Sequence, residues 1–246
     1  MFDLTGKIAL VTGSGQGVGL GIARTLIDAG ATVYVNDLVA ERAETAAAEL
    51  GSNAKALPFN VADFDQVVAA IASASPIDIL VNNAGVLRDR TIAKMTLEDW
   101  DIVQNVNLKS AFLMCREVQA HMRAAGWGRI VNLSSIAALG AVGEANYSAA
   151  KAAIQGLTRT LAIELGRYGI TANAVAPGFV VTEMTREVAR RMNMPFEEMV
   201  GQMLQTIAVG RPGEPDDIAH AVSYFADARA GFVTGQVLYV AGAPRG

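Results

Sequence analysis

The sequence predicts an α/β protein built on a doubly wound parallel sheet with helices on both faces. Short unbroken apolar runs recur along the chain, as in strands that are buried on both sides. Stretches of about 10 to 15 residues with helical periodicity separate these runs, which is the pattern of βαβ units. Of the 246 residues 52% are hydrophobic and only 6% aromatic, so we expect a core of Ala, Val, Ile and Leu.

The first half of the chain contains four predicted strands, each ending in a turn or loop. These strands cover residues 8–12, 32–36, 54–59 and 77–81. Helices are expected between them over residues 16–29, 40–50 and 64–73. Each helix is long enough to return the chain so that the next strand can run parallel to the last.

The second half continues the alternation. Thr96-Leu-Glu-Asp99 predicts a capping box that opens one long helix reaching about Met122. A strand over 128–133, a helix over 146–168 and a strand over 170–175 follow. Pro215 with two acids after it suits the first turn of another helix, and residues 236–240 form the last strand. Without linkers or repeats, residues 1–246 are expected to form one domain.

Composition argues against several classes of partner. The net charge of -4 and the lack of a basic block disfavour nucleic acid and anionic lipid. Cys115 is the one cysteine, and His121 and His220 lack ligand spacing, so no metal site is expected. No apolar run reaches the roughly 18 residues of a membrane span, and the N-terminus has no signal core. We therefore expect a cytoplasmic protein without a membrane partner.

A glycine-rich turn follows the first predicted strand. Residues 12–19 read TGSGQGVG. Glycine lets the backbone approach a pyrophosphate, and the next helix offers free N–H groups and the positive end of its dipole. The spacing Gly13-xxx-Gly17-x-Gly19 differs from the commoner GxGxxG, and such a turn can be only a tight turn. Its place between strand and helix favours a Rossmann-type dinucleotide site.

Asp37 stands at the end of the second predicted strand, about twenty residues past the turn. An acid there accepts hydrogen bonds from the adenosine ribose 2′-hydroxyl and repels a 2′-phosphate. Residues 14–18 and 38–40 contain no Arg or Lys that could neutralise such a phosphate. The sequence therefore predicts NAD, with NADP less favoured. The alternative role for Asp37 is to cap the following helix.

Tyr147 and Lys151 lie four residues apart in a predicted helix and share one of its faces. A free tyrosine has a pKa of roughly 10, and a neighbouring ammonium favours its phenolate. Ser134 and Ser135 end a strand at the sheet edge where ligands bind, so a hydroxyl there can hold a substrate oxygen. The pattern indicates acid–base chemistry, although a tyrosine and a lysine at this spacing also occur as a surface pair.

Over essentially its whole length the chain resembles the short-chain dehydrogenases/reductases. The motifs that carry the resemblance are Thr12-Gly-xxx-Gly-x-Gly19, Asn82-Asn-Ala-Gly85, Asn107-Leu108, Ser135, Tyr147-xxx-Lys151, Pro177-Gly178 and Thr234-Gly-Gln236. Such motifs in family order are far more specific than any one of them. Within the family the pattern is most similar to 3-oxoacyl-[acyl carrier protein] reductases. The residues that fit this subgroup are Arg88-Asp89, Trp100, Asn146-Tyr147 and Gly210-Arg211.

The resemblance implies a role for each matched residue. Tyr147 would be the general acid/base, and Lys151 would lower its pKa and bind the nicotinamide ribose. Ser135 would position the carbonyl oxygen, and Asn107 would hold a water that links Lys151 to solvent. The residues expected to contact the cofactor are Gly13, Gln16, Gly17, Val18, Gly19, Asp37, Leu38, Asn60, Val61, Asn82, Ala84, Gly85, Tyr147, Lys151, Pro177, Gly178, Val180 and Thr182.

Two departures from the family pattern affect these roles. Ser135 lies twelve residues before Tyr147, where many relatives have thirteen, so Ser134 stays open as the catalytic serine. Asn60 stands where many relatives carry Asp, and it too could accept from the adenine amino group.

Three functions fit these residues. We favour an NAD-dependent oxidoreductase that interconverts a secondary alcohol and a ketone. The second is a 3-oxoacyl-[acyl carrier protein] or acyl-CoA reductase. Those enzymes usually take NADPH, which Asp37 disfavours, and often carry a basic residue where this chain has Tyr168, although Arg129 and Arg167 are nearby. A nucleotide-binding scaffold is disfavoured because the whole catalytic set is present.

Residues 182–209 are expected to form a lid over the substrate. They hold Phe196 and five of the nine methionines, at 184, 192, 194, 199 and 203. Methionine suits adaptable apolar surfaces, and the opposite wall at 136–141 is small and apolar, so we expect a hydrophobic cyclic or aromatic substrate. Ordinary helix packing is the alternative for the methionines. Glu144, the acid nearest Tyr147, could bind a polar substituent or face solvent.

The two longest predicted helices, 96–122 and 146–168, exceed what is needed to cover the sheet. Their stretches rich in Ala and Leu allow close helix packing. The resemblance implies that such helices pair across two-fold axes, so a homotetramer is expected.

Overall fold

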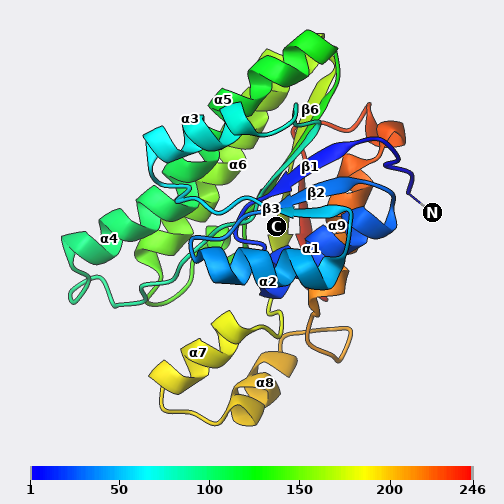
Figure 1. Ribbon diagram of the computed structural model, residues 1–246. Helices are drawn as coiled ribbons and strands as arrows, with labels where there is room; N and C mark the ends of the chain where they lie inside the picture. Colours follow the sequence, from blue (N-terminus) through cyan, green and yellow to red (C-terminus); the bar gives the residue numbers. More distant parts are fainter. Residues whose placement is uncertain (1, 245–246) are drawn as a thin grey trace.

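The protein is built on a single sheet of parallel strands, described for residues 2–244 in a computed structural model (Figure 1). The sheet has seven strands in the order β3-β2-β1-β4-β5-β6-β7. Their bounds are β1 Ile8–Val11, β2 Thr32–Val35, β3 Ala54–Ala56, β4 Ile79–Asn82, β5 Gly128–Leu133, β6 Ile170–Pro177 and β7 Val237–Val240. The predicted doubly wound parallel sheet is confirmed.

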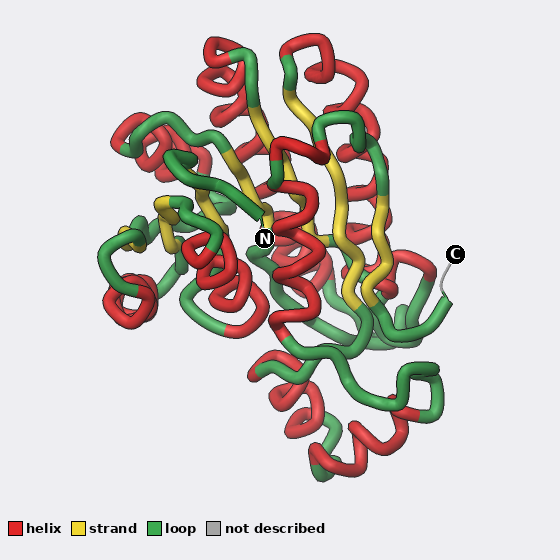
Figure 2. The backbone as a smooth tube through the Cα atoms, turned by 90° about the vertical axis from the view of Figure 1, so that its right-hand side faces the viewer, coloured by secondary structure: helices red, strands yellow, loops and turns green. Residues whose placement is uncertain are grey.

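Helices cover both faces of the sheet (Figures 1 and 2). On one face lie α1 (Gly17–Asp28), α2 (Ala40–Leu50) and α9 (Pro215–Ala226). On the other lie α3 (Phe64–Ser73), α5 (Ser110–Ala125) and α6 (Ala145–Leu165), with α4 (Leu97–Gln104) packed against α6.

Successive strand residues enter opposite hydrophobic cores, which explains the unbroken apolar runs. Val11 and Val81 belong to the core under α1 and α9, whereas Leu10 and Leu80 belong to the core under α5. All four side chains are fully buried. A strand buried on both faces needs apolar residues at every position, without the alternation of a half-exposed strand.

The strand order reverses at β1, which has β2 on one side and β4 on the other. Helices that follow these strands leave to opposite faces and open a crevice at the carboxyl ends of β1 and β4. The glycine-rich turn after β1 and residues 83–85 after β4 meet at this crevice. The fold therefore brings two motifs that lie about 70 residues apart into contact.

The predicted single helix from Thr96 to about Met122 is wrong in one respect. The Thr96 hydroxyl accepts from the Asp99 amide at 3.0 Å, as the predicted capping box requires. The chain stays helical to Ala125, but the turn Asn105–Lys109 between α4 and α5 is π-helical and not α-helical. A π turn holds one residue more than an α turn, and it commonly marks a functional position.

Helices α7 (Glu183–Arg191) and α8 (Phe196–Leu204) project beyond the carboxyl edge of the sheet (Figure 1). The ends of this segment are joined, because the Val181 amide donates to the Gly213 carbonyl at 2.9 Å and the Gly213 amide to Phe179 at 3.0 Å. The sequence pattern does not predict α7, because its residues are mostly charged or polar and only Ala189 is buried.

The remaining differences concern strand ends. The predicted third strand stops at Ala56 instead of residue 59, the fourth covers Ile79–Asn82 instead of 77–81, and the sixth continues to Pro177. Apolar residues continue past the last ladder hydrogen bonds because the connecting segments are also packed, as at the buried Phe59. The predicted helix 146–168 ends as an α-helix at Leu165, and Gly166–Tyr168 form a 3-10 turn.

The Thr12 hydroxyl joins the carboxyl ends of β1 and β4. It accepts from the backbone amides of Asn83 and Ala84, both at 3.0 Å. In the opposite direction, the Asn83 side chain donates to the carbonyls of Thr12 at 2.8 Å and Gly13 at 2.9 Å. Thr12 is 2% exposed, so water cannot readily replace these bonds.

Thr12→Val should lower the free energy of unfolding by about 1–3 kcal/mol, because two amide groups lose their acceptor while the side-chain shape is kept. Urea unfolding followed by circular dichroism measures the change. Thr12→Ser is the matched control: it keeps the hydroxyl and should cost less than about 1 kcal/mol. Equal effects of the two substitutions would contradict the proposed role of the hydroxyl.

Candidate active site

The glycine-rich turn approaches its neighbours so closely that side chains have no room. A Cβ on Gly13 would lie 2.8 Å from Cα of Ala84, and one on Gly19 would lie 2.4 Å from the Gly13 carbonyl oxygen. Gly13 and Gly17 also have positive φ angles of 61° and 59°. The turn therefore presents backbone to the N-terminus of α1, which fits a pyrophosphate group.

Asp37 follows β2 beside this turn and is 6% exposed. Its Oδ1 accepts from the Val39 amide at 3.0 Å, while Oδ2 points toward Gly15. Val39 and not Asp37 is the N-cap residue of α2, and it makes no side-chain cap bond. The arrangement leaves Oδ2 placed for a ribose hydroxyl, and it favours the cofactor role over the capping role.

Several predicted cofactor residues have side chains engaged elsewhere. Asn82 donates to Asn132 Oδ1 at 2.8 Å and to the Cys115 sulfur at 3.3 Å, so its amide group points into the protein and not into the crevice. Asn60 Oδ1 accepts from the Ala62 amide at 3.0 Å. Val61 belongs to the hydrophobic core. Such residues can contact a cofactor mainly through their backbone.

The remaining predicted contacts lie around the same edge. Thr182 caps α7 by accepting from the Thr185 amide at 3.3 Å, and a Cβ on Gly17 would meet Thr182 at 3.8 Å. The start of the α7–α8 segment therefore borders the glycine-rich turn. The other predicted cofactor residues on or near this edge are Gln16, Val18, Leu38, Ala84, Gly85, Pro177, Gly178 and Val180. Among them Gln16 and Leu38 are exposed and Val180 is buried.

Lys151 is 3% exposed and extends from α6 toward the end of β5. Its Nζ donates to the Leu133 carbonyl at 2.8 Å and lies 5.3 Å from the centroid of the Tyr147 ring. Burial lowers the pKa of this amine to about 8. The lysine is therefore held by one backbone carbonyl, with its charge close to the Tyr147 ring.

The two serines at the end of β5 have different surroundings. Ser134 is 3% exposed, and its hydroxyl donates to the Lys151 carbonyl at 2.9 Å. Ser135 accepts from the Ala137 amide at 3.1 Å, and its hydroxyl lies close enough to Tyr147 to lower the pKa of the phenol. The geometry favours Ser135 as the serine that faces a substrate, and it gives Ser134 the role of holding α6.

Tyr147 departs from the electrostatic expectation. Burial raises the pKa of its phenol, and the nearby carboxyl groups of Glu144 and Asp89 raise it further, while the hydrogen bond from Ser135 opposes them. In the chain alone the Lys151 ammonium bonds the Leu133 carbonyl and not the phenol, so the lowering expected from it stays a prediction. The phenol is therefore fully protonated near neutral pH.

Asn107 lies in the π turn and is 2% exposed. Its Nδ2 donates to the carbonyls of Val86 and Val103, both at 3.0 Å. Its Oδ1 is buried without a hydrogen-bond partner among the described residues, and a Cβ on Gly85 would lie only 2.7 Å from it. A buried acceptor of this kind fits a bound water or polar ligand group.

Asn146 is a site residue whose positioning role the sequence did not predict. It is fully buried, and its Nδ2 donates to the carbonyls of Arg88 and Asp99, both at 3.0 Å. Its Oδ1 accepts from the Tyr147 amide at 2.8 Å. Asn146 thus connects the loop after β4 and helix α4 to the start of α6. Its place just before Tyr147 was the available signal.

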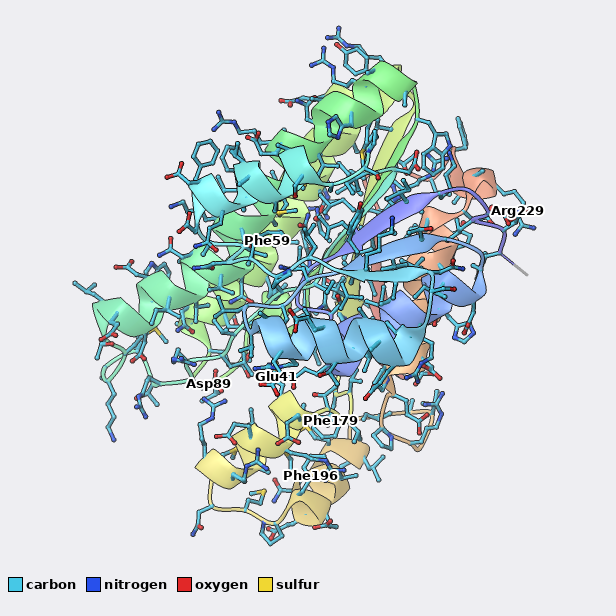
Figure 3. All side chains as sticks on the ribbon, viewed as in Figure 1. Glu41, Phe59, Asp89, Phe179, Phe196 and Arg229 are labelled. Carbon is cyan, nitrogen blue, oxygen red and sulfur yellow. The ribbon has the colours of Figure 1, made fainter. Side chains whose placement is uncertain are left out.

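Glu144 does not simply face solvent. It is half-buried, its segment pairs with Arg90, and burial together with the repulsion of Asp89 raises its pKa to about 7. Burial also raises the pKa of Asp89, which Arg191 on α7 partly offsets. Figure 3 places Asp89 on the side of the body that faces α7. Two carboxyl groups thus lie near Tyr147.

The fold and these residues define a dinucleotide-binding oxidoreductase, with a cofactor turn and a tyrosine–lysine pair on one sheet edge. The chain belongs to the short-chain dehydrogenase/reductase family. The family model described as "Enoyl-(Acyl carrier protein) reductase" matches residues 13–242.

Relatives support this assignment over nearly the full chain. The "(2S)-[(R)-hydroxy(phenyl)methyl]succinyl-CoA dehydrogenase subunit BbsD" of Thauera aromatica is 43% identical, covering 96% of this chain and 95% of its own. The "3-oxoacyl-[acyl-carrier-protein] reductase FabG" of Vibrio harveyi is 38% identical over 98% of both. The crystal structure of a gluconate 5-dehydrogenase from Burkholderia cenocepacia J2315 with NADP and tartrate is 38% identical, with a TM-score of 0.91 covering 98% of this chain and 96% of that one.

Glu144→Gln should stabilise the protein at alkaline pH. The pKa of Glu144 is about 7 in the folded chain against 4.5 as the ordinary value, so its contribution to stability is full below pH 4.5 and lost as pH rises through 7. Glutamine does not titrate. Allowing for solvent screening, the advantage of the variant should grow by about 1–2 kcal/mol between pH 5 and 8.

Urea unfolding at the two pH values measures this difference. Glu49→Gln, on the exposed side of α2, is the matched control for loss of a surface carboxyl group. A Glu144→Gln effect that stays constant from pH 5 to 8 would show that the carboxyl group titrates normally.

Proposed function

We propose that the protein is an NAD-dependent oxidoreductase that interconverts a secondary alcohol and a ketone, with Tyr147 as general acid/base. The observation that carries the proposal is the grouping of Tyr147, Ser135 and Lys151 at the end of β5. The nicotinamide ring, when bound, supplies the hydride acceptor or donor. The protein orients the substrate and moves the proton.

In the direction of reduction, Tyr147 donates its proton to the substrate oxygen, which the Ser135 hydroxyl also holds. The raised pKa of Tyr147 keeps the phenol protonated beforehand. The Lys151 ammonium, 5.3 Å from the ring centroid, stabilises the phenolate that remains. Asn107 Oδ1 is placed to hold a water through which the proton is replaced. In oxidation the same steps run in reverse.

The preference for NAD rests on Asp37. Its carboxylate lies beside the turn where an adenosine ribose would bind, and a 2′-phosphate there would meet a negative charge. The related gluconate 5-dehydrogenase, described in complex with NADP, keeps NADP as the alternative.

The second candidate function is a 3-oxoacyl-[acyl carrier protein] or acyl-CoA reductase, which the FabG relatives support. Of the two basic residues near Tyr168, Arg167 is exposed, whereas Arg129 does not support docking of an acidic carrier. Arg129 is 3% exposed, and its guanidinium donates to the carbonyls of Gly128 at 2.8 Å and Gly169 at 3.3 Å. Such an arginine is committed to the fold and does not present its charge to a partner.

A hydrophobic cyclic or aromatic substrate fits the surroundings of the site. On the segment 182–209, which we propose as a lid, Met184 and Met192 are 42% and 58% exposed. In the segment 136–141 Leu139 is exposed as well. Exposed apolar side chains on both segments favour an apolar ligand. The phenyl group in the name of the Thauera aromatica relative supports an aromatic ligand.

The proposed homotetramer rests on the outer surface of α5 and α6. A groove of about 670 Å³ runs along α5 and the C-terminal half of α6. Phe112 in this groove is 48% exposed and Ile163 is 83% exposed. A second copy of the chain that covered this surface would bury both side chains.

We place the protein in the cytoplasm and treat residues 1–246 as one catalytic domain. Across residues 2–244, no helix has the length and apolar character needed to cross a bilayer. The same residues contain no group of His, Cys, Asp and Glu that could hold a metal ion.

Tyr147→Phe should lower kcat at least about a hundredfold while dissociation constants for the cofactor change little, because the ring still packs and only the proton donor is lost. Lys151→Met should reduce both turnover and cofactor affinity. Tyr224→Phe, on the exposed surface of α9, is the control and should leave kcat unchanged. Retention of more than about a tenth of kcat in Tyr147→Phe, with chemistry rate-limiting, would exclude the proposed role.

Steady-state kinetics test substrate and cofactor together. We expect kcat/KM to be highest for a cyclic or aryl secondary alcohol with NAD, compared with a short polyol, a 3-hydroxyacyl thioester, and NADP. A value of kcat/KM about tenfold higher for the polyol would refute the apolar pocket. A thioester that wins would favour the second candidate function, and a preference for NADP would refute the cofactor assignment.

Light scattering at micromolar concentration should give about four times the chain mass of 25.8 kDa. Phe112→Glu, which puts a charge on the exposed groove, should lower that mass. A monomeric mass for the unmodified chain would refute the tetramer.

A further inference from the structure

Three residues that are separated in the sequence lie close together at the glycine-rich turn: Gly15, Asp37 and Arg42. Arg42 lies in the first turn of α2, and its Nη1 is 3.8 Å from Asp37 Oδ2. A Cβ built on Gly15 would lie 2.6 Å from the same Oδ2 and 3.1 Å from Cγ of Arg42. The carboxylate therefore occupies the space between the turn and the guanidinium.

The guanidinium of Arg42 has unused hydrogen-bond donors in this arrangement. A distance of 3.8 Å is too long for a hydrogen bond, and no other side-chain hydrogen bond joins Arg42 to the described residues. Its side chain is 40% exposed, whereas that of Asp37 is only 9% exposed. A guanidinium has five N–H donors and binds phosphate oxygens in pairs. Arg42 thus retains donors for an anion larger than the Asp37 carboxylate.

The position of that anion follows from the site already described. If the adenosine ribose contacts Asp37 Oδ2, a group on its 2′-oxygen must lie at the carboxylate, on the side of Arg42. The Asp37 carboxylate and the Arg42 side chain fill the space that a side chain at Gly15 would need, so removal of the carboxylate would open room for such a group. The local charge there is one carboxylate against one guanidinium, so a 2′-phosphate meets repulsion and attraction together.

We infer that Arg42 is a latent binding residue for the 2′-phosphate of NADP, masked by the carboxylate of Asp37. The inference rests on the proposed cofactor site and adds a second specificity residue to it. It implies that the choice between NAD and NADP depends on two charges and not on Asp37 alone. Removing the carboxylate should expose a phosphate site that the chain already carries.

A double-mutant comparison tests this by binding instead of by turnover. Dissociation constants for NADH and NADPH are measured by fluorescence titration, and those for ADP and 2′,5′-ADP by calorimetry. Asp37→Ser should tighten binding of NADPH and 2′,5′-ADP at least about tenfold relative to the unmodified chain, and it should weaken NADH. Adding Arg42→Met should abolish the gain and leave NADH and ADP within about twofold of Asp37→Ser.

Arg229→Met is the matched control. Arg229 pairs with Asp227 well away from Glu41 at the start of α2, as the labels of both residues show in Figure 3. In the Asp37→Ser background it should change no dissociation constant. Thermal unfolding of each variant verifies that it is folded.

The outcomes separate this inference from the proposed function. Equal affinity of Asp37→Ser and Asp37→Ser/Arg42→Met for 2′,5′-ADP would overturn the role of Arg42 while leaving the enzyme assignment intact. Equal loss of ADP and 2′,5′-ADP affinity on removing Arg42 would also overturn it, since the arginine would then act on the turn and not on the phosphate. An unmodified chain that binds neither dinucleotide would overturn both proposals.

Discussion

The Thr12 hydroxyl sets the geometry on which the rest of the site depends. By accepting two amides from the segment after β4, it fixes that segment against the glycine-rich turn. Gly85, at the end of the same segment, then lies against Asn107, and Asn107 holds the π turn through the carbonyls of Val86 and Val103. A continuous series of contacts thus positions the glycine-rich turn relative to the π turn that carries Asn107.

The buried charges form a second constraint. Lys151 is held by a single carbonyl, and burial already lowers its pKa to about 8. The carboxyl groups of Glu144 and Asp89 oppose the ionisation of Tyr147 from the other side. Without a bound cofactor, the site therefore favours the uncharged forms of its titratable side chains. A bound cation near the phenol would shift this balance toward the phenolate.

The sheet, its helices and the motifs on its edge follow from apolar runs and glycine positions, because burial on two faces leaves a clear pattern in sequence. Three features do not. The π turn at Asn105–Lys109 has an ordinary helical sequence, in which the buried Asn107 is not marked as different from its neighbours. Helix α7 lacks an apolar stripe. The direction of the Asn82 side chain and the approach of Arg42 to Asp37 depend on tertiary contacts that no local pattern records.

The joined ends of the α7–α8 segment have an evolutionary consequence. Because Phe179 and Val181 meet Gly213 through backbone hydrogen bonds, the intervening residues leave and re-enter the body at one point. Insertions, deletions or exchange of this segment therefore need not disturb the sheet or the proton-transfer residues. The segment is a module that descendants of one ancestral chain can replace while inheriting the same redox chemistry.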